Sequence, residues 1–555
     1  MLRIAFGLTL ALSIALSAAP VIAAERPAST HQRLVTLFSE WRAFNHPVIV
    51  RGRPDYGVVA MAARANGLKS FKRRLAAIDT RDWSTSENGD FRLVEAEMNG
   101  LDFFLRILRP WARDPSFYQT IFPEMSDVPA HEGPSAEPNI DLFQYRYPLG
   151  KSDDAHLTEL IGAVPALLAD AKVNLAQSDA HDLWAYGDRA FTGQAKALAD
   201  LEAGTLTLND LEGRRTASLE GASPQLKAAV EAARLASEDF ATWVRAEAPK
   251  RTGPSGVGKD NYNWFLKHVL LSPLDFDQQV VLLQRELARS LASLRLEETR
   301  NRSAPPIAEL SDPQAYKNMS LARYERLYGL LVDAGFIQDK AYFRSALFGQ
   351  LGDYTPPAAR NFFTHVTALD PLPLASHQFH WIELARLRHE PHPSPIRDTP
   401  PLFNIYAERS EGLATAMEEV LMQAGLYDDE PHGRELVWIM LANRAARGLA
   451  SLRVQANEIR LDEAGKFHAA WTPRGWSDAN SPLVGFEQLL YLRQPGYGPS
   501  YIVGKASIDH LLAVASHKAE IDHRSFSVSD TFAAIWASAI VPPTIIEDEF
   551  LQPAK

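Results

Sequence analysis

The chain has 555 residues, of which 46% are hydrophobic, and it carries a formal net charge of −11. A chain of this length and composition can bury a large core. Its acidic balance argues against nucleic acid or an anionic membrane as a partner, because both bind basic surfaces. The sequence contains no cysteine, which excludes disulfides, thiolate nucleophiles and cysteine-based zinc sites.

Residues 1–24 have the pattern of a secretory signal peptide. Arg3 precedes an apolar run over residues 4–18, and small residues then lead to a cleavage site after Ala23 or Ala24. A membrane anchor is the alternative, but the run is shorter than the ~20 residues that cross a bilayer. We expect a mature protein that is periplasmic or secreted and has no stable membrane anchor.

Helical periodicity dominates the mature chain, with apolar residues at three- and four-residue steps. This pattern predicts helices over residues 157–175, 224–244, 276–296, 321–334, 408–426 and 434–459. Strand patterns are sparse, and the two best short candidates are residues 365–369 and 467–471. The sequence therefore predicts a mainly α protein, a large helical body with few short strands.

Segments rich in proline, glycine and serine predict loops between these helices. They cover residues 129–138, 248–258, 302–306, 353–357 and 391–401. The segment at 248–258 is long and polar and lies between two long predicted helices. We therefore expect an N-terminal helical lobe over residues 25–250 and a C-terminal helical lobe over residues 251–555 that carries the functional site.

Residues 253–259 match the first part of a phosphate-binding loop, Gly-x-x-x-x-Gly-Lys. Such a loop follows a buried strand and has serine or threonine directly after the lysine. Here the preceding residues are polar, and Asp260 follows Lys259. These two departures argue against a nucleotide site.

Two histidines and a glutamate lie at three-residue steps where a predicted helix begins. His377, His380 and Glu383 share a narrow arc of that helix, so their polar ends can converge. Imidazole nitrogens and a carboxylate are a zinc-compatible set of ligands. The alternative interpretation is a solvated helix face with no function.

Two further segments place polar groups next to glycine. Glu411 precedes Gly412 within a predicted helix, and glycine costs ~1 kcal/mol in a helix interior, which indicates the close approach of a neighbour. A packing glycine beside surface glutamates is the alternative. Farther along, a loop broken by glycine and proline ends in Tyr501. A tyrosine held there can donate a hydrogen bond to a developing oxyanion, or it can simply fill a core.

Taken together, these segments resemble a bacterial family called domain of unknown function 885, over nearly the whole mature chain. The motifs that carry the resemblance include Arg-Pro-Trp-Ala-Arg-Asp-Pro-Ser-Phe-Tyr at 109–118, Tyr-Pro-Leu-Gly-Lys at 147–151, Glu-Gly-Leu-Ala at 411–414, Trp-Thr-Pro-Arg-Gly-Trp at 471–476 and Pro-Gly-Tyr-Gly-Pro-Ser-Tyr at 495–501. Each motif is modestly specific, and their shared order is strongly so.

Much of this family resembles all-helical zinc metallopeptidases with a deep central cleft and a His-Glu-x-x-Pro-Gly-His motif. In that chemistry two histidines and a glutamate hold zinc, and the glutamate after the first histidine polarises the attacking water. The resemblance implies that His380 is the second histidine and Glu411 the carboxylate ligand. It also implies that Arg447 and Tyr501 match the arginine and the tyrosine of the family's later segments.

The match to this motif is incomplete. Leu374 and Ala375 stand where the first histidine and the base glutamate should be. Ser451, Gln455 and Tyr497 replace further polar residues of the family's pattern. Either the metal site has been rebuilt, with His377 as the new ligand and Glu383 or Glu408 as the new base, or the cleft binds its ligand without zinc hydrolysis.

Three functions therefore stay open. The first is an exported hydrolase that binds a small peptide or amide in its cleft. Its zinc ligands would be His377, His380 and Glu411, and its catalytic groups would be Glu383, Arg447 and Tyr501. The second is a non-catalytic protein of the cell envelope whose cleft binds or scaffolds. The third is a metal-free enzyme in which Glu383 and Glu411 act as acid and base.

Overall fold

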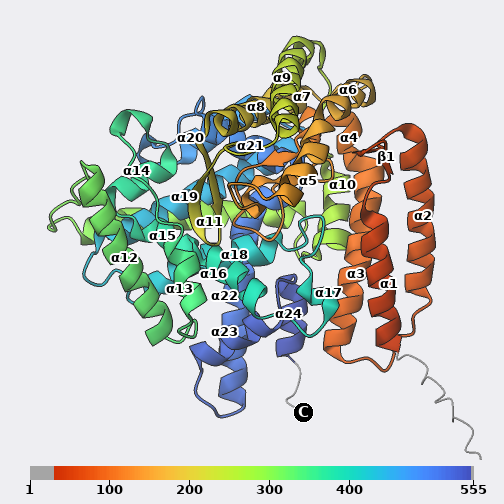
Figure 1. Ribbon diagram of the computed structural model, residues 1–555. Coiled ribbons are helices and arrows are strands. Elements are labelled where there is room, and N and C mark those ends of the chain that lie inside the picture. The colour runs from red at the N-terminus through yellow and green to blue at the C-terminus, as the bar shows by residue number, and fades with distance from the viewer. Residues whose placement is uncertain (1–29, 552–555) are drawn as a thin grey trace, which may run out of the picture.

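The structure, a computed structural model, describes residues 30–551, and helices make up most of this range (Figure 1). The predicted mainly α fold is confirmed. The predicted signal peptide lies outside the described residues. Within residues 30–551, every helix is too short or too polar to cross a membrane.

The helices follow one another along the whole described chain. The first nine are α1 (Thr30–Asn45), α2 (Val58–Ala76), α3 (Thr85–Phe103), α4 (Pro110–Arg113), α5 (Lys151–Gly162), α6 (Val164–Asn174), α7 (His181–Ala185), α8 (Asp188–Ala203) and α9 (Pro224–Glu247). Next come α10 (Lys259–Phe265), α11 (Phe276–Arg300), α12 (Pro313–Asp333), α13 (Ala341–Phe348), α14 (Phe362–Leu369), α15 (Leu372–His377), α16 (Phe379–His389) and α17 (Pro395–Asp398). The last are α18 (Ala407–Gln423), α19 (His432–Gln455), α20 (Leu461–Trp471), α21 (Pro482–Arg493), α22 (Tyr497–Ile521), α23 (Val528–Ala537) and α24 (Pro543–Phe550).

The described strands are short and form three separate pairs. Two pairs are antiparallel, β1 (Ile49–Val50) with β2 (Arg53–Pro54) and β5 (Leu206–Asp210) with β6 (Gly213–Ala217). The third is parallel, β3 (Ile121–Phe122) with β4 (Ile140–Asp141). The chain between β3 and β4 contains the predicted loop at 129–138.

The predicted helices are confirmed with shifted ends, and one of them divides in two. The segment at 157–175 forms the end of α5 and all of α6, because Pro165 lies in the first turn of a new helix. The two predicted strands are wrong: residues 365–369 lie in α14 and residues 467–471 in α20. Short apolar runs fit a helix face as well as a strand, so periodicity cannot separate them.

The central helices pack around α18 and α22. Figure 1 shows α1–α3 side by side at one flank and α12 and α13 at the opposite flank, and α18 contacts α22, α19 and α15 between them. The main hydrophobic core draws on α1 and α3 as well as on the C-terminal helices. A second core lies within residues 56–248, and the division into two lobes at residue 250 stays a prediction.

Helices α18 and α22 cross where each has a glycine. A Cβ on Gly504 would lie 2.6 Å from Cα of Gly412 and still closer to the carbonyl oxygen of Glu408. Only residues without a side chain permit this approach. The close neighbour predicted from Gly412 is therefore α22, and the crossing fixes Glu411 against the start of α22.

Candidate metal centre

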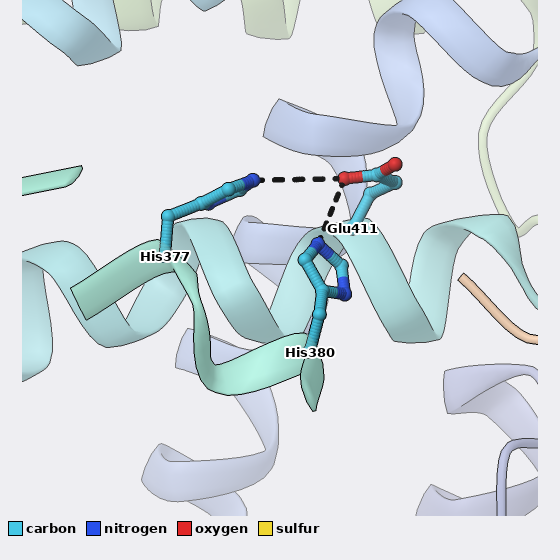
Figure 2. A group of neighbouring side chains, drawn as sticks. All are labelled: His377, His380 and Glu411. Atoms are coloured by element: carbon cyan, nitrogen blue, oxygen red, sulfur yellow. Dashed lines mark ion pairs between the residues drawn. The ribbon is translucent and has the colours of Figure 1, made fainter. Parts of the chain in front are cut away.

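His377, His380 and Glu411 converge in the interior, and Glu383, which helical spacing grouped with the two histidines, is not part of this set. His377 ends α15, His380 lies in the first turn of α16, and Glu411 projects from α18 (Figure 2). Nε2 of His380 lies 3.2 Å from Oε2 of Glu411, and Nε2 of His377 lies 3.9 Å from the same oxygen. One ligand atom from each residue lies within 4.8 Å of the other two.

The separations between the ligand atoms are compatible with a bound metal ion. Nε2 of His380 and Oε2 of Glu411 are buried and pair with each other at 3.2 Å. Neither atom makes a hydrogen bond to a further described residue, although buried polar atoms normally have well-formed hydrogen bonds. Two ligands of a tetrahedral zinc lie about 3.4 Å apart, and the two observed separations bracket that value.

The second ring nitrogen of His377 contacts Glu418, which also pairs with Arg444. Nδ1 of His377 lies 3.0 Å from Oε1 of Glu418. Glu418 lies two helical turns after Glu411 on α18. The guanidinium of Arg444, on α19, lies 2.6 Å from the same carboxylate oxygen. A histidine that ligates a metal through one nitrogen typically has a carboxylate or carbonyl at the other, which fixes its ring. The Arg444–Glu418 pair supplies that carboxylate.

Glu411 is positioned by a tyrosine at the start of α22. The hydroxyl of Tyr497 donates a hydrogen bond to Oε1 of Glu411, which leaves Oε2 to face the two histidines. Tyr497 is fully buried, and its ring stacks on Tyr491. The residue that replaces the expected glutamine of the Pro-Gly-Gln loop therefore orients the carboxylate of the candidate centre.

The two histidines differ in their affinity for a proton. Burial, together with the charge of Arg444, holds the pKa of His377 well below its usual value. Burial also disfavours the charged form of His380, but the charges of Glu411 and Asp127 outweigh it and raise the pKa to about 9. A neutral imidazole is the form that binds a metal, so His377 is ready to do so and His380 must lose a proton.

The structure does not bring Glu383 or Glu408 into this group. The carboxylate of Glu383 lies 2.7 Å from Nη2 of Arg409, in an ion pair from which solvent is excluded. Glu408 is buried elsewhere on α18, near Ser272. Glu383 is paired with Arg409, and neither predicted base lies among the converging ligand atoms.

Arg447 and Tyr501 lie beside the centre and against each other. The guanidinium of Arg447 lies 4.3 Å from the ring centroid of Tyr501 and pairs with Glu487. The ring of Tyr501 is stacked near that of His377, at a centroid distance of 6.3 Å. The structure therefore brings both predicted residues to the site, where Tyr501 packs on a candidate ligand.

A cavity of about 590 Å³ is lined by residues that flank His377 and His380 in the sequence, although none of the three candidate ligands lines it. Leu374 and Ala375, which stand where the resemblance would place a histidine and a base glutamate, are among the lining residues. Two acidic residues that the sequence analysis missed, Asp127 and Glu132, line it too, and their charges act on His380 and Glu411. Both come from the segment between β3 and β4, whose place in the fold no local pattern reveals. Glu418, by contrast, shares a face of α18 with Glu411 and could have been found by its seven-residue spacing.

The segment that resembles a phosphate-binding loop has an ordinary structural role. Nζ of Lys259, in the first turn of α10, lies 2.6 Å from a carboxylate oxygen of Asp277. Gly253 forms a backbone bridge with Ala180, and Gly258 donates a backbone hydrogen bond to Gln455. These bonds tie α10 to its neighbours.

The sequence matches no family model and no curated protein. Among solved structures, the chain is similar to a candidate lipoprotein of unknown function from Shewanella oneidensis, with a TM-score of 0.65 and 11% identity, over 95% of this chain and 100% of that chain. It is also similar to a candidate lipoprotein from Colwellia psychrerythraea, with a TM-score of 0.62 and 14% identity, over 94% of this chain and 99% of that chain. At these identities the likeness shows a shared fold, and the resemblance to domain of unknown function 885 stays a prediction.

Proposed function

We propose that this protein is an exported hydrolase that cleaves peptides or small amides with a zinc ion held by His377, His380 and Glu411. One observation carries the proposal: three buried ligand atoms, from two histidines and a glutamate, converge within 4.8 Å of one another. The resemblance to helical zinc peptidases supports it. An envelope location is supported by the two structural neighbours, which are both described as candidate lipoproteins.

The surrounding residues suit such a centre. A bound zinc ion would act as a Lewis acid on a carbonyl in the adjacent cavity. Glu418 and Tyr497 hold His377 and Glu411 in place, so the ligands are oriented before any substrate enters. Tyr501 is the proposed hydrogen-bond donor to the charge that develops on the substrate carbonyl oxygen, because its ring packs beside His377.

Metal analysis and turnover of the same preparations test this proposal. The mature protein should contain one zinc ion per chain and should hydrolyse a member of a panel of dipeptides and amino-acid amides. His380→Ala should lose both the metal and the activity. His510→Ala, which changes an exposed histidine on α22, should keep both. Unimpaired turnover by metal-free protein would contradict the zinc mechanism.

A second candidate is a protein that binds a ligand in this cavity without cleaving it. The observation that favours it is the pair of apolar residues, Leu374 and Ala375, on the cavity wall where the family has histidine and glutamate. Thermal shift against dipeptides and cell-wall fragments would identify such a ligand. Measurable turnover of any ligand found in this way would exclude the non-catalytic function.

A further inference from the structure

One wall of the cavity near the candidate centre carries two carboxyl groups. Asp127 and Glu132 are half-buried there, on the segment between β3 and β4. Each acts electrostatically on Glu411, and Asp127 acts on Glu132. Ionisation of each of these three carboxyl groups is therefore disfavoured by ionisation of the others.

The basic residues around the cavity are already paired with other carboxylates. Arg214 pairs with Asp353, Nε of Arg493 lies 2.6 Å from Asp114, and Nε2 of His131 lies 2.9 Å from Asp141. The positive charges that act on Glu132 belong to His380 and Arg447, which contact Glu411 and Glu487. Among the described residues, Asp127 and Glu132 have no ion-pair partner of their own.

A carboxylate taken out of water needs a compensating partner. Burial raises the pKa of Asp127 and of Glu132, and the neighbouring carboxylates raise both further. Their ionised forms are therefore under-compensated by the protein alone. A cation that enters the cavity would relieve this repulsion.

A second feature of the cavity points to a polar ligand. Ser320, on α12, lines the same cavity with only 2% of its surface exposed. Its hydroxyl has no hydrogen-bond partner among the described residues. Trp381 and Leu489 also line the cavity and give it apolar surface. The cavity thus offers a ligand an acidic wall, an unused hydroxyl and an apolar patch.

We propose that Asp127 and Glu132 bind the positively charged amine of the ligand, so that the cavity takes peptides or amides with a free amino group. This inference rests on the proposed function, because it names the substrate class of the same site. The amine would lie at the acidic wall, whose carboxyl groups interact electrostatically with His380 and Glu411. An N-acylated ligand has no positive charge to offer and would bind poorly.

Calorimetric titration with two matched amides tests the recognition step without requiring turnover. L-phenylalaninamide should bind the mature protein at least about 10-fold more tightly than N-acetyl-L-phenylalaninamide, as expected for a buried charge pair. The double variant Asp127→Asn, Glu132→Gln should lose this preference. Glu124→Gln, which changes an exposed carboxylate of the same cavity, should keep it. Equal binding of both amides, binding of neither, or a preference that survives the double variant would overturn the inference.

Hydrolysis of the same amides by zinc-loaded protein separates this inference from the proposed function. A raised KM of Glu132→Gln for the free amine alone supports amine recognition. An equal fall in kcat for both amides would overturn it and assign Glu132 to proton transfer. Hydrolysis of both amides with equal kcat/KM by the unmodified protein would overturn the inference and leave the hydrolase standing. Selective binding of the amine without hydrolysis would overturn the hydrolase and leave the amine site standing.

Discussion

The carboxylate of Glu383 lies 2.7 Å from a guanidinium nitrogen of Arg409, and both side chains are almost completely buried. Helical spacing puts Glu383 on the same arc as His377 and His380, yet the arginine on α18 binds its carboxylate. Removal of one member of a buried ion pair leaves the charge of the other uncompensated. Glu383 therefore stabilises the contact between α16 and α18.

Substitution of Glu383 and of Glu411 should separate stability from metal binding. Glu383→Gln should leave the zinc content unchanged and lower the free energy of unfolding by about 3–5 kcal/mol, the usual cost of breaking a buried ion pair. Glu411→Gln should weaken zinc binding about 100-fold or more, because a direct ligand is lost. Denaturant unfolding and competition with a zinc chelator measure the two effects. Loss of zinc from Glu383→Gln would show that this glutamate belongs to the centre.

Tyr497→Phe tests whether the tyrosine orients Glu411. Removal of its hydroxyl should weaken zinc binding about 10-fold, as for other groups that position a ligand, and should cost about 1 kcal/mol of stability. The control is Tyr118→Phe, which removes a buried hydroxyl that donates to the carbonyl oxygen of Trp111, on α4. It should cost similar stability without changing zinc affinity. Equal zinc affinities in the two variants would contradict the role of Tyr497.

The three converging residues were grouped before the structure by two kinds of information. The three-residue step predicts that His377 and His380 lie on one side of a helix, and the family resemblance implies His380 and Glu411 as ligands. The Glu411-Gly412 pair also marks a carboxylate at a close helix contact. The position of Asp127 near the candidate centre could not be predicted. It lies in an irregular segment whose position depends on the packing of distant elements, and no periodicity describes such a segment.

In the fold, too, the elements defined by their own local sequence were predicted, whereas short elements were not. Long helices such as α9 and α11 begin at the predicted residues, Pro224 and Phe276, because repeated apolar steps and capping residues define them. The strands at 206–217 were missed because they form a single short hairpin. The wrongly predicted strand at 467–471 continues α20, in which the apolar residues cover one helix face.

Glu408 should make the protein less stable as the pH rises. Burial raises the pKa of Glu408 to about 7. The folded protein therefore keeps this proton over a pH range in which the unfolded chain has lost it, from about 4.5 to 7. Stability falls across that range, by about 3 kcal/mol for a shift of this size. Glu408→Gln should flatten the decline in unfolding free energy between pH 5 and pH 8.

Glu159→Gln is the control for this measurement, since Glu159 is exposed on α5. It should follow the curve of the unmodified protein. An unchanged decline in Glu408→Gln would show that another group, such as Glu418 with its pKa raised by burial to about 7, produces the pH dependence.

The crossing of α18 and α22 should tolerate no side chain. Gly504→Ala would place a Cβ 2.6 Å from Cα of Gly412, against backbone that cannot move aside, and should lower the free energy of unfolding by about 3 kcal/mol. Because the crossing also sets Tyr497 against Glu411, the variant should bind zinc more weakly than the unmodified protein. The control is Gly329→Ala in α12, where a Cβ meets no atom within 4 Å, and it should gain about 1 kcal/mol from helix propensity. Denaturant titration measures the free energy of unfolding of both variants. Equal changes in the two would mean that α18 and α22 can move apart without a loss of stability.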